Sequence, residues 1–290
     1  MYQPKAECMN IAIASGKGGT GKTTVAVNIA SLLSERKEKV CYIDCDVEEP
    51  NGHLFLSPVI TSRTESLIPV PCIDESKCIA CGACVAFCQY RALVRLGKTV
   101  MVFDELCHGC GGCTLVCKQK AISEQAKSIG FVEYGTSGRI EFIHGRLNIG
   151  EAMSPPLIRD VLSHSSNATI KIIDSPPGTS CPVIAAVRDC DFVVLVTEPT
   201  PFGLNDLGLA IDMVKELSIP FGVVINRDDP QIKDGVNFCT ARNAPVLGTI
   251  PDDRRIAEAY SNGRILIETL DFVKPYFSGI IDNVISKVTP

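Results

Sequence analysis

The stretch from Ser15 to Thr24, SGKGGTGKTT, has the residue types and spacing of a loop that holds phosphate groups. It fits the pattern G-x-x-x-x-G-K-[ST] at every fixed position: Gly16, Gly21, Lys22 and Thr23. Backbone N–H groups of such a loop point inward, and the dipole of the following helix adds positive potential. We expect Lys22 to reach the β- and γ-phosphates and the Thr23 hydroxyl to ligate Mg²⁺. The loop therefore predicts a site for ATP or ADP with Mg²⁺.

Two flanking segments make this interpretation specific. Residues 9–14 (MNIAIA) form a short apolar run before the loop, and residues 25–33 (VAVNIASLL) have a helical pattern after it. A solvated glycine-rich turn without a ligand would not need a strand before it and a helix after it. The remaining loop residues expected at the nucleotide are Gly18, Gly19, Thr20 and Thr24, the last beside the α-phosphate.

Acidic residues end two further apolar runs. Asp44 and Asp46 close residues 39–46 (KVCYIDCD), and Asp174 closes residues 169–174 (TIKIID). Such runs are typical of parallel strands buried on both faces, and ligands of open α/β sheets bind at the carboxyl ends of the strands. These aspartates are therefore expected near the phosphates. For Asp44, a structural role at the strand end is the alternative to contact with Mg²⁺ or water.

Eight cysteines between residues 78 and 117 form two blocks of identical spacing. Each block reads C-x₂-C-x₂-C-x₃-C, and each cysteine of the first block recurs 29 residues later, which indicates an internal duplication. This is the spacing of a two-cluster bacterial ferredoxin, in which the fourth cysteine of each block ligates the other cluster. One [4Fe–4S] cluster is then expected on Cys78, Cys81, Cys84 and Cys117, and the other on Cys107, Cys110, Cys113 and Cys88.

Zinc is the alternative metal for these blocks, since paired C-x-x-C motifs also hold Zn²⁺. Three closely spaced cysteines with a remote fourth, found twice, favour iron–sulfur clusters instead. The proline that usually follows the fourth cysteine is replaced here by Gln89 and Lys118. Polar groups near the sulfurs can shift the potentials of the clusters.

The amino-acid composition restricts the partners and the cellular compartment that we expect for this protein. The net charge of −5 and pI near 5.5 argue against nucleic acid as the main partner, because no basic stripe is available to meet phosphates. Without a run of 18 apolar residues, stable membrane insertion is not expected. The opening MYQPKAEC lacks the apolar segment of a signal peptide, so we expect a cytoplasmic protein. Thiols stay reduced there, so metal explains fifteen cysteines better than disulfides.

The strands and helices that must position these residues are expected to alternate along the chain. Further strands are expected at residues 192–197, 221–226 and 246–250, and helices at residues 151–162, 205–217 and 235–242. Residues 130–148 alternate as strands do, with turns at residues 135–138 and at Gly145. Strands that alternate with helices predict an α/β fold with a parallel, doubly wound sheet.

The composition changes from about Pro58, before the cysteine blocks, while nucleotide-binding features lie on both sides of them. The cysteine segment is therefore interpreted as an insertion into one domain. We expect a discontinuous P-loop ATPase domain at residues 1–60 and 126–290. An α+β ferredoxin-like domain is expected at residues 61–125.

These motifs together resemble one family. Lys17 directly follows the first glycine of the loop, and the resulting KGGTGKTT is similar to the deviant Walker A motif of the MinD/Mrp superfamily. The chain most resembles MinD-superfamily P-loop ATPases that contain an inserted ferredoxin domain. The resemblance extends from the loop through DCDVEEPN at residues 44–51, the cysteine blocks and DSPPGTSCP at residues 174–182 to Asn226.

The resemblance implies catalytic roles for three residues besides Lys22. Lys17 corresponds to the signature lysine that reaches across a dimer interface to the partner's phosphates. Asp46 corresponds to the switch I aspartate that orients the attacking water, and Asp174 to the switch II aspartate that contacts Mg²⁺ through water. Positioning and positive charge of this kind account for most of the catalysis of phosphoryl transfer.

The resemblance also implies further contacts to the nucleotide. Gly178 would offer a backbone N–H to the γ-phosphate, and Asn226 and Pro251 correspond to positions that hold the adenine. Cys181 lies seven residues after Asp174, where the nitrogenase iron protein has a cysteine that helps to hold a cluster between two subunits. That protein uses a second cysteine per subunit, which has no obvious counterpart here, so a packed thiol is the alternative for Cys181.

We therefore expect an ATPase that dimerises, with an identical chain or a paralogue, and couples nucleotide state to electron transfer with a redox partner protein. The alternative is a carrier or assembly ATPase for iron–sulfur or metal cofactors, but Mrp-type carriers use a late C-x-x-C pair that this chain lacks. A third possibility is an ATPase for spatial positioning, like MinD, which would need a basic amphipathic tail for membrane binding. Residues 272–288 carry few cations, so ordinary packing is expected there.

Overall fold

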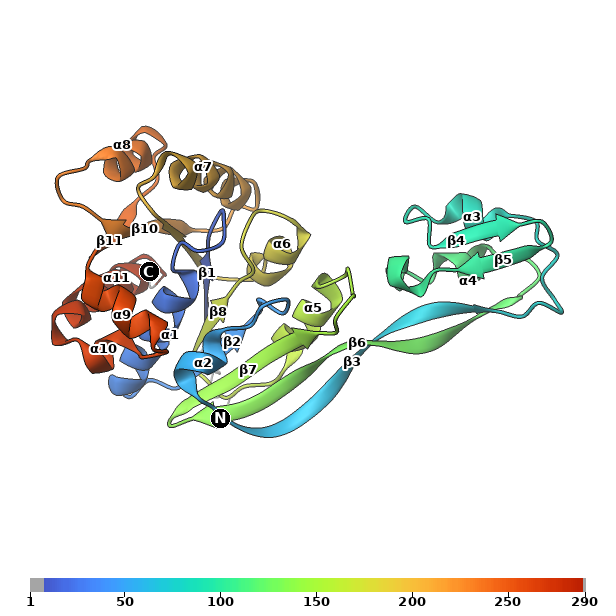
Figure 1. Ribbon diagram of the computed structural model, residues 1–290, viewed down its shortest axis with the longest axis horizontal. Helices are drawn as coiled ribbons and strands as arrows, with labels where there is room; N and C mark the ends of the chain where they lie inside the picture. The colour runs from blue at the N-terminus through green and yellow to red at the C-terminus, as the bar shows by residue number, and fades with distance from the viewer. Residues whose placement is uncertain (1–7, 289–290) are drawn as a thin grey trace, which may run out of the picture.

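The structure, a computed structural model, describes residues 8–288, and its centre is a nine-stranded sheet (Figure 1). The strand order is β11-β10-β9-β1-β8-β2-β7-β6-β3. All pairs from β11 to β7 are parallel, and β6 and β3 add an antiparallel edge. The strands are β1 Met9–Ala14, β2 Val40–Asp44, β3 Val59–Ile73, β6 Ile122–Ser137, β7 Ile140–Leu147, β8 Ile170–Asp174, β9 Phe192–Thr197, β10 Phe221–Asp228 and β11 Val246–Pro251.

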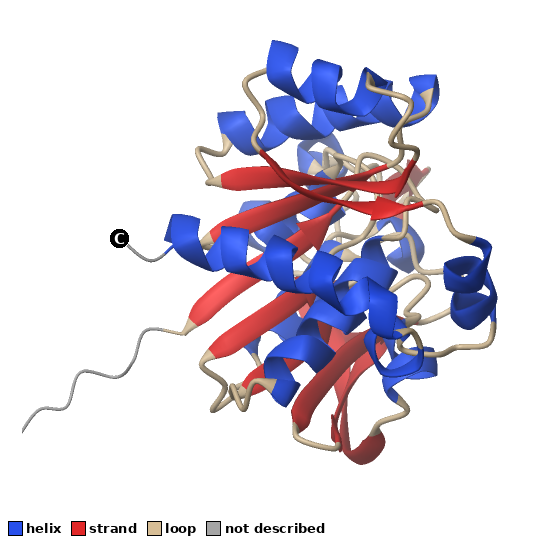
Figure 2. Ribbon diagram, turned by 90° about the vertical axis from the view of Figure 1, so that its left-hand side faces the viewer, coloured by secondary structure: helices blue, strands red, loops and turns tan. Residues whose placement is uncertain are grey.

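Helices cover both faces of this sheet, and each face has its own apolar core (Figure 2). One face carries α1 Lys22–Glu35, α2 Gly52–Leu56, α9 Arg254–Ser261, α10 Leu266–Thr269 and α11 Lys274–Val288. The other carries α5 Pro155–Ser163, α6 Cys181–Val187, α7 Pro201–Glu216 and α8 Asp234–Ala241. The doubly wound α/β sheet predicted from the sequence is confirmed. No helix among residues 8–288 combines the length and the apolarity needed to cross a membrane.

Strands β3 and β6 pair with each other over almost their whole length and continue past the sheet as a two-stranded ribbon. At its far end lies a small lobe, residues 74–121, which we call the cysteine lobe (Figure 1). The expected insertion limits, residues 61 and 125, fall inside these two strands, so the chain runs from sheet to lobe without a break in pairing. The lobe contains α3 Ala83–Phe87, β4 Leu93–Leu96, β5 Thr99–Val102, a short 3₁₀ segment Asp104–Leu106 and α4 Gly112–Val116.

The two cysteine blocks have the same local structure. Helices α3 and α4 start 29 residues apart, as the sequence repeat predicts. Left-handed backbone recurs at the same offset, including at Gly82 and Gly111, where glycine adopts positive φ without steric cost. The other matched left-handed pairs are Ala80 with Gly109 and Arg91 with Lys120.

Several expected elements differ from the structure. The turn predicted at Gly145 is wrong, because β7 runs through this residue; a side chain there would meet Val47 and Val161 at 2.6 Å. The helix expected from residue 151 begins only at Pro155. Strand β3 was not predicted. The expected packing of residues 272–288 is confirmed, since α11 buries Phe277 in the core.

Candidate functional site

The glycine-rich loop joins β1 to the first turn of α1, as expected from its flanking segments. Gly16 packs so closely on α7 that an added Cβ would lie 2.1 Å from the carbonyl oxygen of Asp206. Gly21 has a positive φ of 91° and lies against Asn226, whose amide donates a 2.8 Å hydrogen bond to the carbonyl of Thr20. The Oγ1 atom of Thr20 is buried without a partner. The loop is therefore held from two sides in a shape that leaves a polar group for a ligand.

Lys22 meets the predicted aspartates. Its Nζ lies 2.7 Å from Oδ1 of Asp174 and 3.7 Å from Oδ2 of Asp46, and the residue is only 7% exposed. Tyr42 donates a 2.9 Å hydrogen bond to the other oxygen of Asp174. Asp44 lies opposite Asp174 in the sheet and accepts hydrogen bonds from the backbone N–H groups of Asp46 and Gly52. The sheet thus brings together one lysine and three carboxylates.

Burial of these carboxylates governs their protonation. Burial raises the pKa of Asp44 to about 8, with the charge of Asp174 as the second cause and the Gly52 N–H opposing both. The pKa of Asp46 rises to about 6, also through burial, although Lys22 lowers it. The pKa of Lys22 is raised, because the attraction of Asp174 and Asp46 outweighs its burial. A bound phosphate would compete with these carboxylates for the lysine.

Lys17 is held within the chain. It forms an ion pair with Glu198, which also lies 3.1 Å from Nη1 of Arg227. The pKa of Glu198 is lowered, since the hydrogen bond from Lys17 and the two cations outweigh its burial. Because the lysine side chain is 29% exposed, it lies at the surface beside the loop. Its predicted reach into a partner subunit remains a prediction.

The switch residues predicted from the sequence lie around Lys22. Asp46 lines a cavity of about 460 Å³ with Pro176, Pro177 and Ser180, which leaves room for water beside its carboxylate. Gly178 has a φ of 96°, and its N–H donates to the carbonyl of Ser15 at 2.9 Å. That N–H must leave Ser15 before it can meet a γ-phosphate.

A cavity of about 300 Å³ adjoins the loop on its other side. Asn226 and Pro251, the two residues expected at the adenine, both line it, together with Gly21 and Thr24. The sequence did not reveal the remaining wall, which the end of β10, α9 and the segment before α9 supply. These residues are Arg227, Asp252, Asp253, Ile256, Ala257 and Tyr260. Ile256 and Tyr260 are four residues apart on α9, a spacing that places them on one face of the helix.

A row of polar side chains crosses the sheet from this site to the edge strand β3. Asp174, Asp44, His144, Glu133 and Arg63 lie directly opposite one another on five neighbouring strands, β8, β2, β7, β6 and β3. Cross-strand partners of this kind present their side chains on one face. Nε2 of His144 lies 2.7 Å from Glu133, and Glu133 lies 3.9 Å from Arg63. No sequence motif marks this row.

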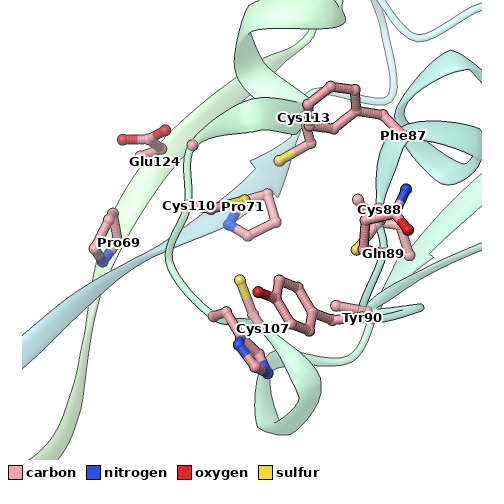
Figure 3. Close-up of a pocket in the computed structure, with 14 residues that line it drawn as sticks. Pro69, Pro71, Phe87, Cys88, Gln89, Tyr90, Cys107, Cys110, Cys113 and Glu124 are labelled. Carbon is pink, nitrogen blue, oxygen red and sulfur yellow. The ribbon is translucent and has the colours of Figure 1, made fainter. Parts of the chain in front are cut away.

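The eight predicted metal-binding cysteines line two separate cavities of the cysteine lobe. Cavity A is lined by Cys78, Cys81, Cys84 and Cys117. Cavity B is lined by Cys107, Cys110, Cys113 and Cys88 (Figure 3). These are the two sets expected when the fourth cysteine of each block crosses to the other group.

The linings of both cavities are mostly apolar, and backbone N–H groups point at some sulfurs. The N–H of Gly109 donates to Sγ of Cys107 at 3.5 Å, and the N–H of Ala121 donates to Sγ of Cys117 at 3.3 Å. Burial raises the pKa of Cys84, Cys107 and Cys113. Among residues 8–288, no group of three or more His, Cys, Asp and Glu side chains is close enough to hold a single metal ion.

Cys181 lies apart from both cavities, at the first residue of α6, and is exposed. Its neighbours Ser180 and Pro182 line the cavity of Asp46. The thiol is thus near the switch segments. Its role in a bridge between subunits remains a prediction.

Comparison with known proteins agrees with this geometry. Residues 11–267 match the family model of the CobQ/CobB/MinD/ParA nucleotide binding domain. The chain belongs to this family. An uncharacterised protein of Methanocaldococcus jannaschii is 33% identical over 270 residues, covering 92% of this chain and 94% of the relative. The iron-sulfur cluster carrier protein of Aquifex aeolicus is 26% identical over 273 residues, covering 89% of this chain and 61% of the carrier.

Solved structures of other proteins share the fold of this chain. The cell division ATPase MinD of Pyrococcus furiosus superposes with a TM-score of 0.59 at 20% identity, covering 95% of this chain and 98% of MinD. MinD of Pyrococcus horikoshii in complex with Mg-ADP gives a TM-score of 0.58 at 18% identity, covering 96% of each chain. As a family member, this chain is a P-loop ATPase built on a MinD-like sheet.

Proposed function

We propose that this chain is an ATPase whose nucleotide state controls electron transfer through two [4Fe–4S] clusters in an inserted ferredoxin domain. The ATPase domain would comprise residues 1–60 and 126–290, and the ferredoxin domain residues 61–125. The observation that carries the proposal is the ribbon of β3 and β6. It connects the sheet that forms the nucleotide site with a lobe whose two cavities are each lined by four cysteines.

The spacing of the cysteines favours four-iron clusters over zinc. Thiolates at roughly 2.3 Å from one tetrahedral Zn²⁺ lie only about 3.8 Å from one another. In a four-iron cluster each cysteine binds its own iron, so the sulfurs surround a larger group. Each cavity is lined by three cysteines of one block and the fourth cysteine of the other, which is the grouping that the two-cluster spacing predicts. Such clusters, when bound, supply one-electron transfer.

The residues of the nucleotide site suit hydrolysis of ATP to ADP and phosphate. Lys22 would leave Asp174 to bind the β- and γ-phosphates, and Thr23, half-buried in the first turn of α1, would hold Mg²⁺. Freed from the lysine, Asp174 would accept a hydrogen bond from Mg²⁺-bound water. Asp46 would orient the attacking water in its cavity. Asn226 and Pro251 would hold the adenine.

Dimerisation is part of the proposal and depends on Lys17. The lysine would exchange Glu198 for the phosphates of the partner's nucleotide, either in a homodimer or in a heterodimer with a paralogue. Glu198 would keep its contact with Arg227 after the exchange. The redox partner would be a separate protein.

Coupling between the two parts would use the polar row described above. Replacing the Lys22–Asp174 ion pair by phosphate and Mg²⁺ changes the field at Asp44, which lies beside His144 on the next strand. His144 and Glu133 then transmit the change to the ribbon. Switch elements that respond to the γ-phosphate are a recurring device of this kind.

The test is anaerobic purification followed by iron analysis and redox kinetics. We expect about eight iron atoms per chain, because two four-iron clusters are predicted. The rate at which a neutral quinone reoxidises the reduced protein should differ between ATP, ADP and nucleotide-free states. His144→Phe should remove this dependence while ATP hydrolysis continues. Equal rates in all nucleotide states would refute the coupling, and an absence of iron would refute the clusters.

A carrier of iron–sulfur clusters is the second candidate, and the similarity to proteins named iron-sulfur cluster carrier protein favours it. Against it, all eight ligands lie within one lobe, and residues 118–290 contain no C-x-x-C pair. The discriminating experiment mixes the reduced protein with ATP and a cluster-free acceptor protein. Electrons should leave while iron stays; iron that moves to the acceptor would favour the carrier.

A further inference from the structure

Tyr42 carries a buried hydroxyl that no sequence motif marks. The residue lies in the middle of β2, is fully buried, and belongs to the apolar core on the α1 face of the sheet. Its ring stacks on Phe142 of the neighbouring strand β7, with ring centroids 5.8 Å apart and 12° between the planes. Phenylalanine has the same ring, so packing alone does not require the hydroxyl.

The hydroxyl contacts the carboxylate of Asp174. Tyr42 lies opposite Ile172 on β8, and Asp174 is two residues further along that strand, a diagonal that an aromatic side chain can span. The hydroxyl donates a hydrogen bond to Oδ2 of Asp174 at 2.9 Å, while Nζ of Lys22 lies 2.7 Å from Oδ1. The two oxygens of this buried carboxylate therefore have different partners.

The two partners differ in how they are held. Lys22 begins α1 directly after the glycine-rich loop and is expected to move from Asp174 to the phosphates when ATP binds. Tyr42 is enclosed by Phe142 and by Gly52 at the start of α2, where an added Cβ would lie 2.4 Å from the tyrosine ring and 2.5 Å from its hydroxyl oxygen. The hydrogen bond from Tyr42 can therefore persist after Lys22 has left.

The hydroxyl remains a donor at neutral pH. Burial raises the pKa of Tyr42 well above its ordinary value of 10, and the negative charges of Asp174 and Asp44 raise it further. A neutral phenol donates a charge-assisted hydrogen bond to a carboxylate, which is stronger than a bond between neutral groups. Within residues 8–288, this is the one hydrogen bond that Oδ2 of Asp174 accepts. Tyr42 thus fixes one oxygen of Asp174 whether or not Lys22 occupies the other.

We propose that Tyr42 is a positioning residue for ATP hydrolysis: its hydroxyl holds Oδ2 of Asp174, so that Oδ1 is available to Mg²⁺ and its bound water once Lys22 has moved to the phosphates. This inference rests on the proposed role of Asp174 at Mg²⁺ and does not depend on the clusters. Groups that orient a metal-binding side chain through a hydrogen bond change metal affinity or activity by about 10- to 100-fold when they are removed.

The test measures metal affinity separately from catalysis. Mn²⁺ replaces Mg²⁺ in the ADP complex of the full-length protein, and the electron paramagnetic resonance signal of free Mn²⁺ reports how much metal is bound. We expect Tyr42→Phe, which removes only the hydroxyl, to weaken Mn²⁺ binding about tenfold and to lower kcat about tenfold. The affinity for ADP without metal should change less than about threefold, since Lys22 and the loop still bind the phosphates.

Two further variants keep the result interpretable. Phe192→Leu leaves a gap in the same apolar core, but at the first residue of β9 and so at the opposite end of the parallel strands from Asp174. It should lower stability and leave the Mn²⁺ affinity unchanged. Gly52→Ala keeps the hydroxyl of Tyr42 but crowds it, so this variant should also weaken Mn²⁺ binding. It provides the same measurement if Tyr42→Phe does not fold.

A Mn²⁺ affinity within about twofold of wild type in Tyr42→Phe would overturn the inference, as would the same result in Gly52→Ala if Tyr42→Phe does not fold. An equal loss of Mn²⁺ affinity in Phe192→Leu would also overturn it, because the effect would then come from packing. Asp174→Asn separates this inference from the proposed function. If Asp174→Asn weakens Mn²⁺ binding and Tyr42→Phe does not, Asp174 serves the metal and only the role of Tyr42 fails. If neither variant weakens it, the proposed role of Asp174 fails as well.

Discussion

Replacing Lys22 by methionine removes the buried lysine that forms ion pairs with Asp174 and Asp46. At an effective dielectric constant of about 20, its separations of 2.7 Å from Asp174 and 3.7 Å from Asp46 correspond to about 6 and about 4.5 kcal/mol of attraction. The cost of burying the charges offsets most of this. Removal of one member of a buried ion pair destabilises a protein by about 3 to 5 kcal/mol, and we expect that loss for Lys22→Met at pH 8.

The loss of stability caused by Lys22→Met should depend on pH in a defined direction. The pKa values of Asp46 and Asp44 are raised to about 6 and about 8, so the folded protein holds more protons than the unfolded chain between the ordinary value of 3.8 and these values. Stability contributed by these groups therefore falls as pH rises through that window. Without Lys22 both pKa values rise further. The difference in stability between wild type and variant should thus shrink when the pH is lowered from about 8 to about 5.

Urea unfolding of the nucleotide-free protein, followed by circular dichroism, measures this difference at both pH values. The matched control is Lys17→Met, since this lysine is in the same loop but is 29% exposed and pairs only with Glu198. We expect it to cost less than about 1 kcal/mol. Lys22→Met should also lose ATP binding while the iron content stays unchanged. A destabilisation below about 1 kcal/mol, or one equal at both pH values, would refute the reasoning, and a simultaneous loss of iron would show that the two parts do not fold separately.

Further substitutions test the site and the lobe. Asp46→Asn should retain ATP binding but reduce hydrolysis at least about 100-fold, because the residue that orients water is lost; unchanged hydrolysis in a phosphate-release assay would exclude that role. Gly16→Ala should destabilise the protein by about 1 to 3 kcal/mol and weaken ATP binding, since its Cβ would meet Asp206 at 2.1 Å; unaltered thermal unfolding and calorimetric affinity would contradict this. Cys117→Ser and Cys78→Ser should each remove about four of eight iron atoms and leave the same electron paramagnetic resonance signal, because the two cysteines are expected on one cluster; a residual spectrum of Cys117→Ser that matches Cys107→Ser instead would disprove the crossed ligation.

The local sequence was sufficient to predict where most residues of the nucleotide site lie. The loop, its strand and its helix are consecutive, so spacing alone placed Gly16, Lys22 and Thr23 correctly on them. The carboxyl ends of parallel strands meet at one edge, which is why Asp46 and Asp174 could be assigned to the same site. The crossed grouping of the cysteines was predicted from the spacing typical of two-cluster ferredoxins, and the linings of the two cavities group the cysteines in the same way.

Register between distant strands could not be predicted in this way. His144, Glu133 and Arg63 lie in no motif, and only the pairing of β7, β6 and β3 places them opposite Asp44. The ribbon was missed because β3 contains two prolines, Pro69 and Pro71, and begins where the composition changes. Both prolines lie where the ribbon has passed beyond the sheet, at an edge strand that tolerates the missing N–H groups.

The architecture would limit how ATP acts on the proposed clusters. All eight cysteines lie within residues 78–117, so a shift of the ribbon moves both cavities as one unit without altering their ligand sets. The row from Asp174 to Arg63 ends on β3 inside the sheet, before the ribbon begins, and none of its members belongs to the cysteine lobe. Under the proposed function, nucleotide state should then change the position of the cysteine lobe and the access of a redox partner to it, while iron remains bound. This separates an electron-transfer ATPase from a carrier, which must open a ligand set to release its cluster.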